Sequence, residues 1–233
     1  MSVNQTYLTR RSVELSNLEV DEFLMFRVKL QNLLLPLGIL AIATLAFFTY
    51  SAAAAPLPEG FPPPTSEGKI EIKQYPAYRC ATVRYSGELS MAASSAFNPL
   101  YRHISSNNIG MTAPVETRYP VSTMEVGEIG VPDERGEAKV SFLYRSTDIY
   151  PEQIAQDIQV EDIAPMTVVS LGLKGSYDYK SYQQSIERLQ DWLTQHPEYT
   201  RVGAPRRFFY DAPYIPEPFK RSEIQIPIRL KHD

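Results

Sequence analysis

Cysteine and histidine are scarce in this chain, and their scarcity removes several kinds of site. Cys80 is the only cysteine among 233 residues, and the three histidines are His103, His196 and His232. A single cysteine excludes a disulfide within the chain, and a lone thiol in a strand-like stretch is typical of a small buried hydrophobic side chain. With so few thiols and imidazoles, a structural zinc site lacks its usual ligands.

The sequence also lacks runs of positive charge and phosphate-binding glycine motifs. Lys and Arg total 23 against 27 for Asp and Glu, which gives a formal net charge of -4 and a pI near 5.5. This balance provides no general attraction to nucleic acid, so we expect no nucleic-acid partner. The missing glycine fingerprints argue against a Rossmann-type enzyme.

Charge is missing altogether between Lys29 and Glu59, and most of this stretch is apolar. Residues 33–55 read LLLPLGILAIATLAFFTYSAAAA, and the preceding residues 1–32 form a polar N-terminal tail. About 20 apolar residues in a helix rise far enough to cross the hydrocarbon layer of a bilayer. We therefore predict a single transmembrane helix over residues 33–55.

Two interpretations of this apolar segment stay open. Basic residues precede it and glutamates follow it, so the N-terminus of an uncleaved signal anchor would be cytoplasmic and the C-terminal domain would lie across the membrane. The alternative is export after signal cleavage near Ala54, because residues 52–55 offer small side chains in an A-x-A arrangement. The polar lead is long for a signal peptide, and Pro56 would follow a cut at Ala55 poorly, so we favour the anchor.

The next segment has the composition of a spacer. Residues 56–68 read PLPEGFPPPTSEG, with five prolines and two glycines. Such a composition stays extended and semi-rigid. It predicts a Pro-rich linker between the membrane segment and a globular domain over residues 69–233.

This domain combines short strand-like runs with two amphipathic helices. Alternating polarity predicts strands in KIEIKQY, YRCATVRYSG, KVSFLYR, MTVVSLGLKG, RRFFYD and EIQIPIRL. Two further strands are expected within residues 111–118 and around residues 159–163. A second helix begins near Ser181, and one of its faces carries Tyr182, Ile186, Leu189 and Leu193. Each half holds strands, one helix and further strands. We therefore predict an α+β fold, a distorted antiparallel β-barrel or sheet of two similar halves flanked by two helices.

The first helix begins near Leu89 and is the main candidate for a ligand site. Its 3.6-residue period predicts a core stripe of Ala93, Phe97, Leu100, Tyr101 and Ile104. The neighbouring strip has mostly small side chains, Ala92, Ser95, Ala96, Pro99 and His103. Small side chains let a flat ligand approach the helix backbone closely, so this strip predicts a groove.

Pro99 and the residues after the helix affect its course. Pro99 lacks an N–H for the carbonyl of Ser95, so either the helix is kinked or Asn98 caps a shorter helix. The helix should end at Asn107, Asn108 and Gly110, because these residues tolerate left-handed backbone.

Four stretches together resemble the SOUL haem-binding protein family. They are IEIKQYPAYRCATV, SNNIGMTAPV, VSFLYRS and YDAPYIPEPFKRSEIQIPI, within residues 67–230 and in the family's order. The resemblance implies a distorted antiparallel β-barrel flanked by two helices. It also implies non-covalent, reversible binding of haem or another tetrapyrrole, as a carrier or buffer rather than as a haem redox enzyme.

The same resemblance implies the residues of the site. The family's tetrapyrrole groove maps to Ala92, Ala96, Pro99, Leu100 and His103, and the MTAPV loop adds Met111. Lys220 and Arg221 are candidates to meet the propionates, and Pro76 stands where some members carry a suggested axial histidine. His103 is then either a propionate-facing residue or the metal ligand.

The sequence thus predicts a membrane-tethered tetrapyrrole-binding protein. An enzyme acting on a tetrapyrrole, or an interaction module that uses the same groove for another ligand, are the alternatives. No nucleophile, base and orienting group stand at a recognisable spacing, so we expect no catalytic residues.

Overall fold

The computed structural model describes residues 55–124, 135–212 and 214–231. The predicted N-terminal tail lies outside these residues, as does the predicted transmembrane helix except for Ala55. Within the described ranges, no helix has the length and apolar character needed to cross a bilayer.

Two α-helices and nine strands form the framework of this part, and every strand listed from the sequence is present, with short β7 added. In chain order the elements are β1 (Ile70–Tyr75), β2 (Tyr78–Glu88), η1 (Leu89–Met91), α2 (Ala92–Ser106), β3 (Val115–Arg118), η2 (Val121–Met124), β4 (Arg135–Leu143), β5 (Gln159–Ile163), β6 (Met166–Lys174), α3 (Tyr179–Gln195), β7 (Tyr199–Arg201), β8 (Arg206–Phe209), η3 (Glu217–Phe219) and β9 (Arg221–Leu230). The η elements are short 3-10 helices.

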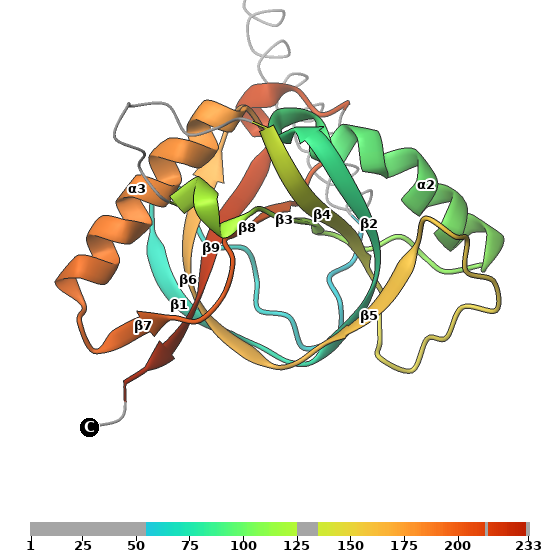
Figure 1. Cartoon of the computed structure of the whole chain (residues 1–233), viewed down its shortest axis with the longest axis horizontal. Coiled ribbons are helices and arrows are strands. Elements are labelled where there is room, and N and C mark those ends of the chain that lie inside the picture. Colours follow the sequence, from blue (N-terminus) through green and yellow to red (C-terminus); the bar gives the residue numbers. More distant parts are fainter. Residues whose placement is uncertain (1–54, 125–134, 213, 232–233) are drawn as a thin grey trace, which may run out of the picture. The chain divides into compact units, whose positions relative to one another are not determined.

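The strands form one antiparallel sheet in the order β1-β6-β9-β8-β3-β4-β2-β5, with β7 beside β9. This order is symmetric about the β3–β8 pair: β4 and β2 follow β3 outward as β9 and β6 follow β8. Two similar halves produce such an order. Figure 1 shows that the sheet is strongly curved. β1 and β5 are the two end strands of this order, and among the described residues they do not pair with each other. The sheet is therefore open, which corrects the prediction of a closed barrel.

Both helices cover the outer side of the curve. Figure 1 shows α2 beside β2 and β4, and α3 beside β6 and β9. The larger apolar cluster lies between the helices and the sheet and includes Val140, Leu171 and Ile226. Because strand side chains alternate, neighbouring residues face opposite sides, and Ala81 belongs to this outer cluster while Cys80 belongs to the inner one.

The second helix follows its sequence prediction closely. Its N-cap is Asp178, whose carboxylate accepts a hydrogen bond from the Ser181 amide at 2.6 Å. Tyr182, Ile186 and Leu189 are buried in the outer cluster, as their spacing predicted. The amphipathic period therefore identified the buried face of α3 correctly.

Residues 55–68, which we call the strap, cross the inner side of the sheet (Figure 1). Phe61 is only 8% exposed, and its ring lies 4.9 Å from Tyr75 and 5.4 Å from Tyr78. The backbone is tied down as well: Glu59 donates to the Arg145 carbonyl at 2.9 Å, and the Pro56 carbonyl accepts from Ala113 at 3.0 Å. The strap, for which the sequence predicts an extended, semi-rigid linker, is thus packed onto the domain in this structure.

Replacing Phe61 by alanine should lower the free energy of unfolding by about 3 kcal/mol, because it removes a buried aromatic ring and leaves a gap. Urea unfolding monitored by circular dichroism would measure the change. Phe219→Ala is the matched control, since Phe219 is 60% exposed and its loss should cost little. Equal stability of the Phe61 and Phe219 variants would mean that the strap contributes no packing.

Candidate functional site

Helix α2 runs without interruption through Pro99. The shorter helix capped at Asn98 is therefore not formed, and the Ser95 carbonyl loses its usual helical donor. The end of the helix agrees with the prediction, since Asn108 has a φ of 53°, in the left-handed region. The Ile109 amide then donates to the Ile104 carbonyl at 2.8 Å and closes the turn.

Part of the strip of small side chains on α2 faces the sheet, whereas Ser95 is exposed. Ala92 and Leu100 have no exposed surface and Ala96 is 1% exposed, so these three residues pack against the strands beneath. Small residues at these positions let the helix backbone approach the sheet. The predicted groove residues Ala92, Ala96 and Leu100 therefore pack in the core in this structure.

The predicted core stripe is displaced by the same packing. Leu100 and Ile104 are buried as expected, but Tyr101 is 52% exposed. Phe97 is half-buried and places its ring edge against Phe142 of β4, 5.3 Å between centroids. The true buried face lies nearer Ala92 and His103 than the large apolar residues indicated.

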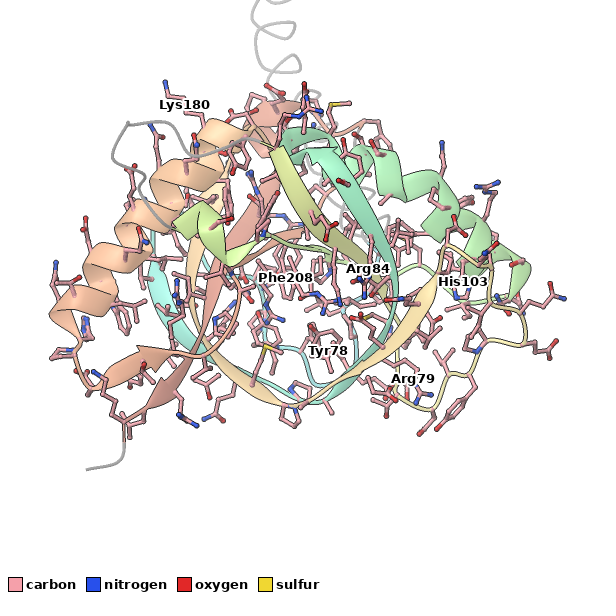
Figure 2. All side chains as sticks on the ribbon, viewed as in Figure 1. Tyr78, Arg79, Arg84, His103, Lys180 and Phe208 are labelled. Carbon is pink, nitrogen blue, oxygen red and sulfur yellow. The ribbon has the colours of Figure 1, made fainter. Side chains whose placement is uncertain are left out.

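His103 is buried beneath the C-terminal end of α2 (Figure 2). Its Nε2 shares a hydrogen bond of 2.7 Å with the hydroxyl of Tyr144, and the two rings are nearly parallel. Burial lowers the pKa of His103, and burial raises the pKa of Tyr144 to about 12. The imidazole is thus neutral near pH 7, and the nitrogen that ligates metals most readily is already engaged.

The outward side of α2 presents an aromatic surface. The rings of Phe97 and Tyr101 stack with 6.0 Å between centroids and an angle of 9°. Met91, at the start of the helix, is 49% exposed, and Arg102 is exposed beside Tyr101. A flat aromatic ligand can lie on such stacked rings, with a basic group beside it for an anionic substituent.

The remaining predicted site residues are distributed over two parts of the domain. Pro99 is half-buried on α2, and half-buried Met111 packs against the outer cluster between α2 and β3. Lys220 lies over the ring of Tyr177 at 5.2 Å, and Arg221 makes an ion pair of 2.8 Å with Asp211. These contacts place Lys220 and Arg221 beside the residues that lead into α3 and out of β8.

The cysteine thiol and the possible metal ligands are two further kinds of reactive group in the described part. The Cys80 thiol is fully buried, and burial raises its pKa to about 12, so it is a poor nucleophile. Across residues 55–124, 135–212 and 214–231, His, Cys, Asp and Glu form no group of three that could hold a metal ion.

Comparison with known proteins identifies the family. The sequence profile described as SOUL heme-binding protein matches residues 63–227, most of the chain. The chain belongs to the SOUL heme-binding protein family. Membership supports haem or tetrapyrrole binding and agrees with the resemblance found in the sequence. The comparison with curated proteins gives no significant match.

Solved structures share the fold at low sequence identity. The C-terminal domain of EcmrR is 15% identical with a TM-score of 0.56, and the match covers 70% of this chain and 98% of that domain. An uncharacterized conserved protein from Listeria innocua is 12% identical with a TM-score of 0.53, covering 71% of this chain and 94% of that protein. At such identity the likeness concerns the fold alone.

Sequence reasoning missed two features of this SOUL domain. Tyr144 was not recognised as the partner of His103, because 41 residues separate them and only the fold brings them together. Tyr101 was assigned to the core because its spacing from Phe97 and Ile104 fits a helical stripe. The available signal was the small size of Ala92 and Ala96, which is what a helix lying close to a sheet requires.

The buried His103 should make the fold less stable in mild acid. An unfolded imidazole has a pKa of about 6.5, and burial lowers the pKa in the folded chain. Below about pH 6.5 the unfolded chain therefore takes up a proton that the folded chain resists, so the free energy of unfolding falls as pH falls. Urea unfolding at pH 7.5 and pH 5.5 should show a smaller difference for His103→Gln than for the native chain.

The matched control is His196→Gln, which removes an imidazole at the end of α3 and leaves the His103–Tyr144 bond in place. This variant should keep the pH dependence of the native chain. The same dependence in all three proteins would contradict the assignment to His103.

Proposed function

We propose that this SOUL family member binds haem or another tetrapyrrole non-covalently on the outward side of α2, and that it carries or buffers the ligand. Family membership supports the ligand class. The observation that carries the location is the stacked pair Phe97 and Tyr101, which offers an exposed aromatic face. Pro99 and Met111 are half-buried, and we do not assign them to this surface.

The residues of this surface fit the ring of a tetrapyrrole better than its metal. Stacked aromatic side chains suit the face of a macrocycle, and exposed Arg102 suits a propionate. His103 Nε2 could ligate iron only after its bond to Tyr144 breaks, and His103 is only 4% exposed. We therefore expect recognition through the ring and its carboxylates.

Titration of the purified full-length chain in lipid nanodiscs with haemin should give a saturable shift of the Soret band, and iron-free protoporphyrin should bind with similar affinity. Tyr101→Ser should weaken both ligands about tenfold, or ~1.4 kcal/mol, because it removes half of the stacked pair. Tyr101→Phe keeps the ring and should bind like the native chain.

Tyr214→Ser is the matched control, because Tyr214 is 78% exposed in the loop between β8 and β9. Its affinity for both porphyrins should be unchanged. Haemin binding that Tyr101→Ser leaves intact would remove α2 as the site, and the absence of any saturable shift would remove the tetrapyrrole function itself.

We further propose that residues 33–55 anchor the chain in a membrane, with the N-terminus in the cytoplasm. The apolar length and the flanking charges support this arrangement. Alkaline carbonate should leave the full-length chain in the membrane pellet, and protease added to the cytoplasmic side should spare the SOUL domain. A soluble product whose N-terminus begins near Ala55 would instead establish export after signal cleavage.

A further inference from the structure

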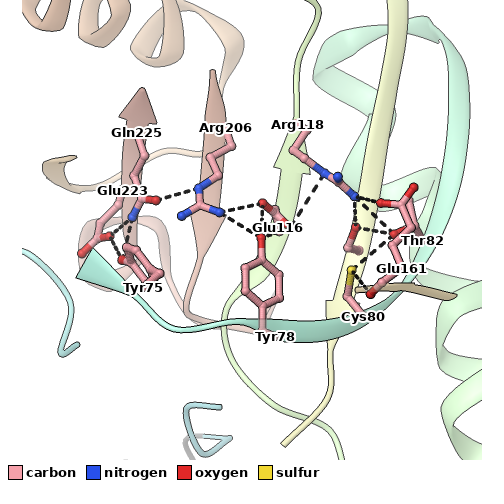
Figure 3. A network of polar contacts seen from close by, with 11 residues as sticks. Tyr75, Tyr78, Cys80, Thr82, Glu116, Arg118, Glu161, Arg206, Glu223 and Gln225 are labelled. Atoms are coloured by element: carbon pink, nitrogen blue, oxygen red, sulfur yellow. Dashed lines mark hydrogen bonds and ion pairs between the residues drawn. The ribbon is translucent and has the colours of Figure 1, made fainter. Parts of the chain in front are cut away.

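The inner side of the sheet carries charged residues that are almost completely buried. Lys73, Glu116, Arg206 and Glu223 are each at most 7% exposed. Figure 3 shows Glu116, Arg206 and Glu223 in one network, in which Arg206 contacts Glu116 at 3.1 Å. Lys73 contacts Glu223 at 2.6 Å. Burying charges is costly, and buried charged groups of this kind are found at functional sites.

Aromatic rings line the same region. Phe61 of the strap enters between Tyr75, Tyr78 and Phe208, and its ring is nearly parallel to that of Phe208 at 6.4 Å. Figure 2 places Tyr78 and Phe208 inside the curve of the sheet. The strap thus supplies an aromatic ring to a box of rings contributed by β1, β2 and β8.

Arg206 lies against this box of rings, and one of its nitrogen atoms makes no hydrogen bond within the described residues. Its guanidinium lies 5.0 Å from the centre of the Tyr75 ring and 4.5 Å from that of Phe208, two of the rings that also contact Phe61. Arg206 is 1% exposed, and its Nη2 has no hydrogen-bond partner among the residues that the structure describes. A buried guanidinium with an unused N–H group can donate a hydrogen bond to the carboxylate of a ligand.

The strap meets the charged network with groups that a small ligand could replace. The Pro63 carbonyl accepts a hydrogen bond from Lys73 Nζ at 2.7 Å, and the Thr65 amide donates to the Glu223 carboxylate. Gly172 of β6 makes room for this crossing, because a Cβ there would overlap the carbonyl oxygens of Thr65 and Ser66. A carbonyl is a weaker partner for an ammonium group than a carboxylate is.

We propose that the inner side of the sheet is a binding site for small aryl carboxylates, and that the strap is its intramolecular occupant. The aryl ring takes the place of Phe61, and the carboxylate takes the free N–H of Arg206 and the ammonium of Lys73. The site lies on the opposite side of the sheet from α2, so its failure would leave the tetrapyrrole proposal untouched.

The first experiment uses 3-phenylpropionate as the probe and its neutral amide, 3-phenylpropionamide, as the matched chemical control. Calorimetry with full-length Phe61→Ala should show binding of the carboxylate at least ten times tighter than to the native chain, because the competing ring is gone. The amide should bind at least ten times more weakly than the carboxylate. Phe219→Ala should behave like the native chain.

Equal binding of the carboxylate and the amide to Phe61→Ala would mean that the ligand only fills the gap left by the ring, and it would overturn the proposal. The proposal would also be overturned if neither compound binds. Gly172→Ala provides a second variant, since its new methyl group should push the strap off and raise the affinity for the carboxylate without altering the ring box.

Hydrogen exchange on the native full-length chain keeps the test valid if these variants do not fold. Millimolar 3-phenylpropionate should reduce the protection of the strap amides Glu59, Thr65 and Gly68, while the sheet amides keep theirs. The amide compound should have no such effect. Unchanged strap protection at millimolar carboxylate would overturn the proposal.

Discussion

The antiparallel pairing of β3 with β8 is the constraint on which the domain depends, because it is the junction of the two halves. On the inner side of this junction Glu116 and Arg206 form an ion pair, and neither residue is more than 1% exposed. Tyr78 of β2 donates to Glu116, and Arg206 donates to Gln225 of β9 at 2.8 Å. Removing one partner would leave a buried charge without compensation, so the four strands are held in one register.

The two sides of the sheet differ in the residues they carry and in the segments that cover them. The outer side is apolar and is covered by α2 and α3, whereas the inner side combines aromatic rings with buried charged residues and is covered by the strap. Because α2 uses Ala92 and Ala96 to approach the strands, its larger aromatic residues are displaced toward solvent. The same close packing therefore removes a groove beneath the helix and creates an aromatic surface on its outer flank.

The sequence predicted the elements better than it predicted their faces. Period and polarity located α3 and its buried residues Tyr182, Ile186 and Leu189, because large apolar side chains define its core stripe. In α2 the buried stripe consists of Ala92, Ala96, Leu100, His103 and Ile104, and a periodicity that weighs large apolar residues points to Tyr101 instead. Backbone proximity to the sheet decided the orientation, and the small size of Ala92 and Ala96 is the local signal for it. Pro227 lies within β9, between the residues that pair with β8 and the residues that pair with β7.

Alternation along a strand gives two faces without saying what covers either one. In β9 the residues Glu223 and Gln225 alternate with Ile224 and Ile226, and this pattern is typical of a strand with one face in solvent. Here both faces are buried, because a proline-rich segment that reads as a spacer folds back over the polar one. The charged residues then need partners from other strands, and these pairings follow from the curvature of the sheet rather than from any motif. A polar face enclosed by the chain's own N-terminal segment is therefore the feature of this fold most hidden from its sequence.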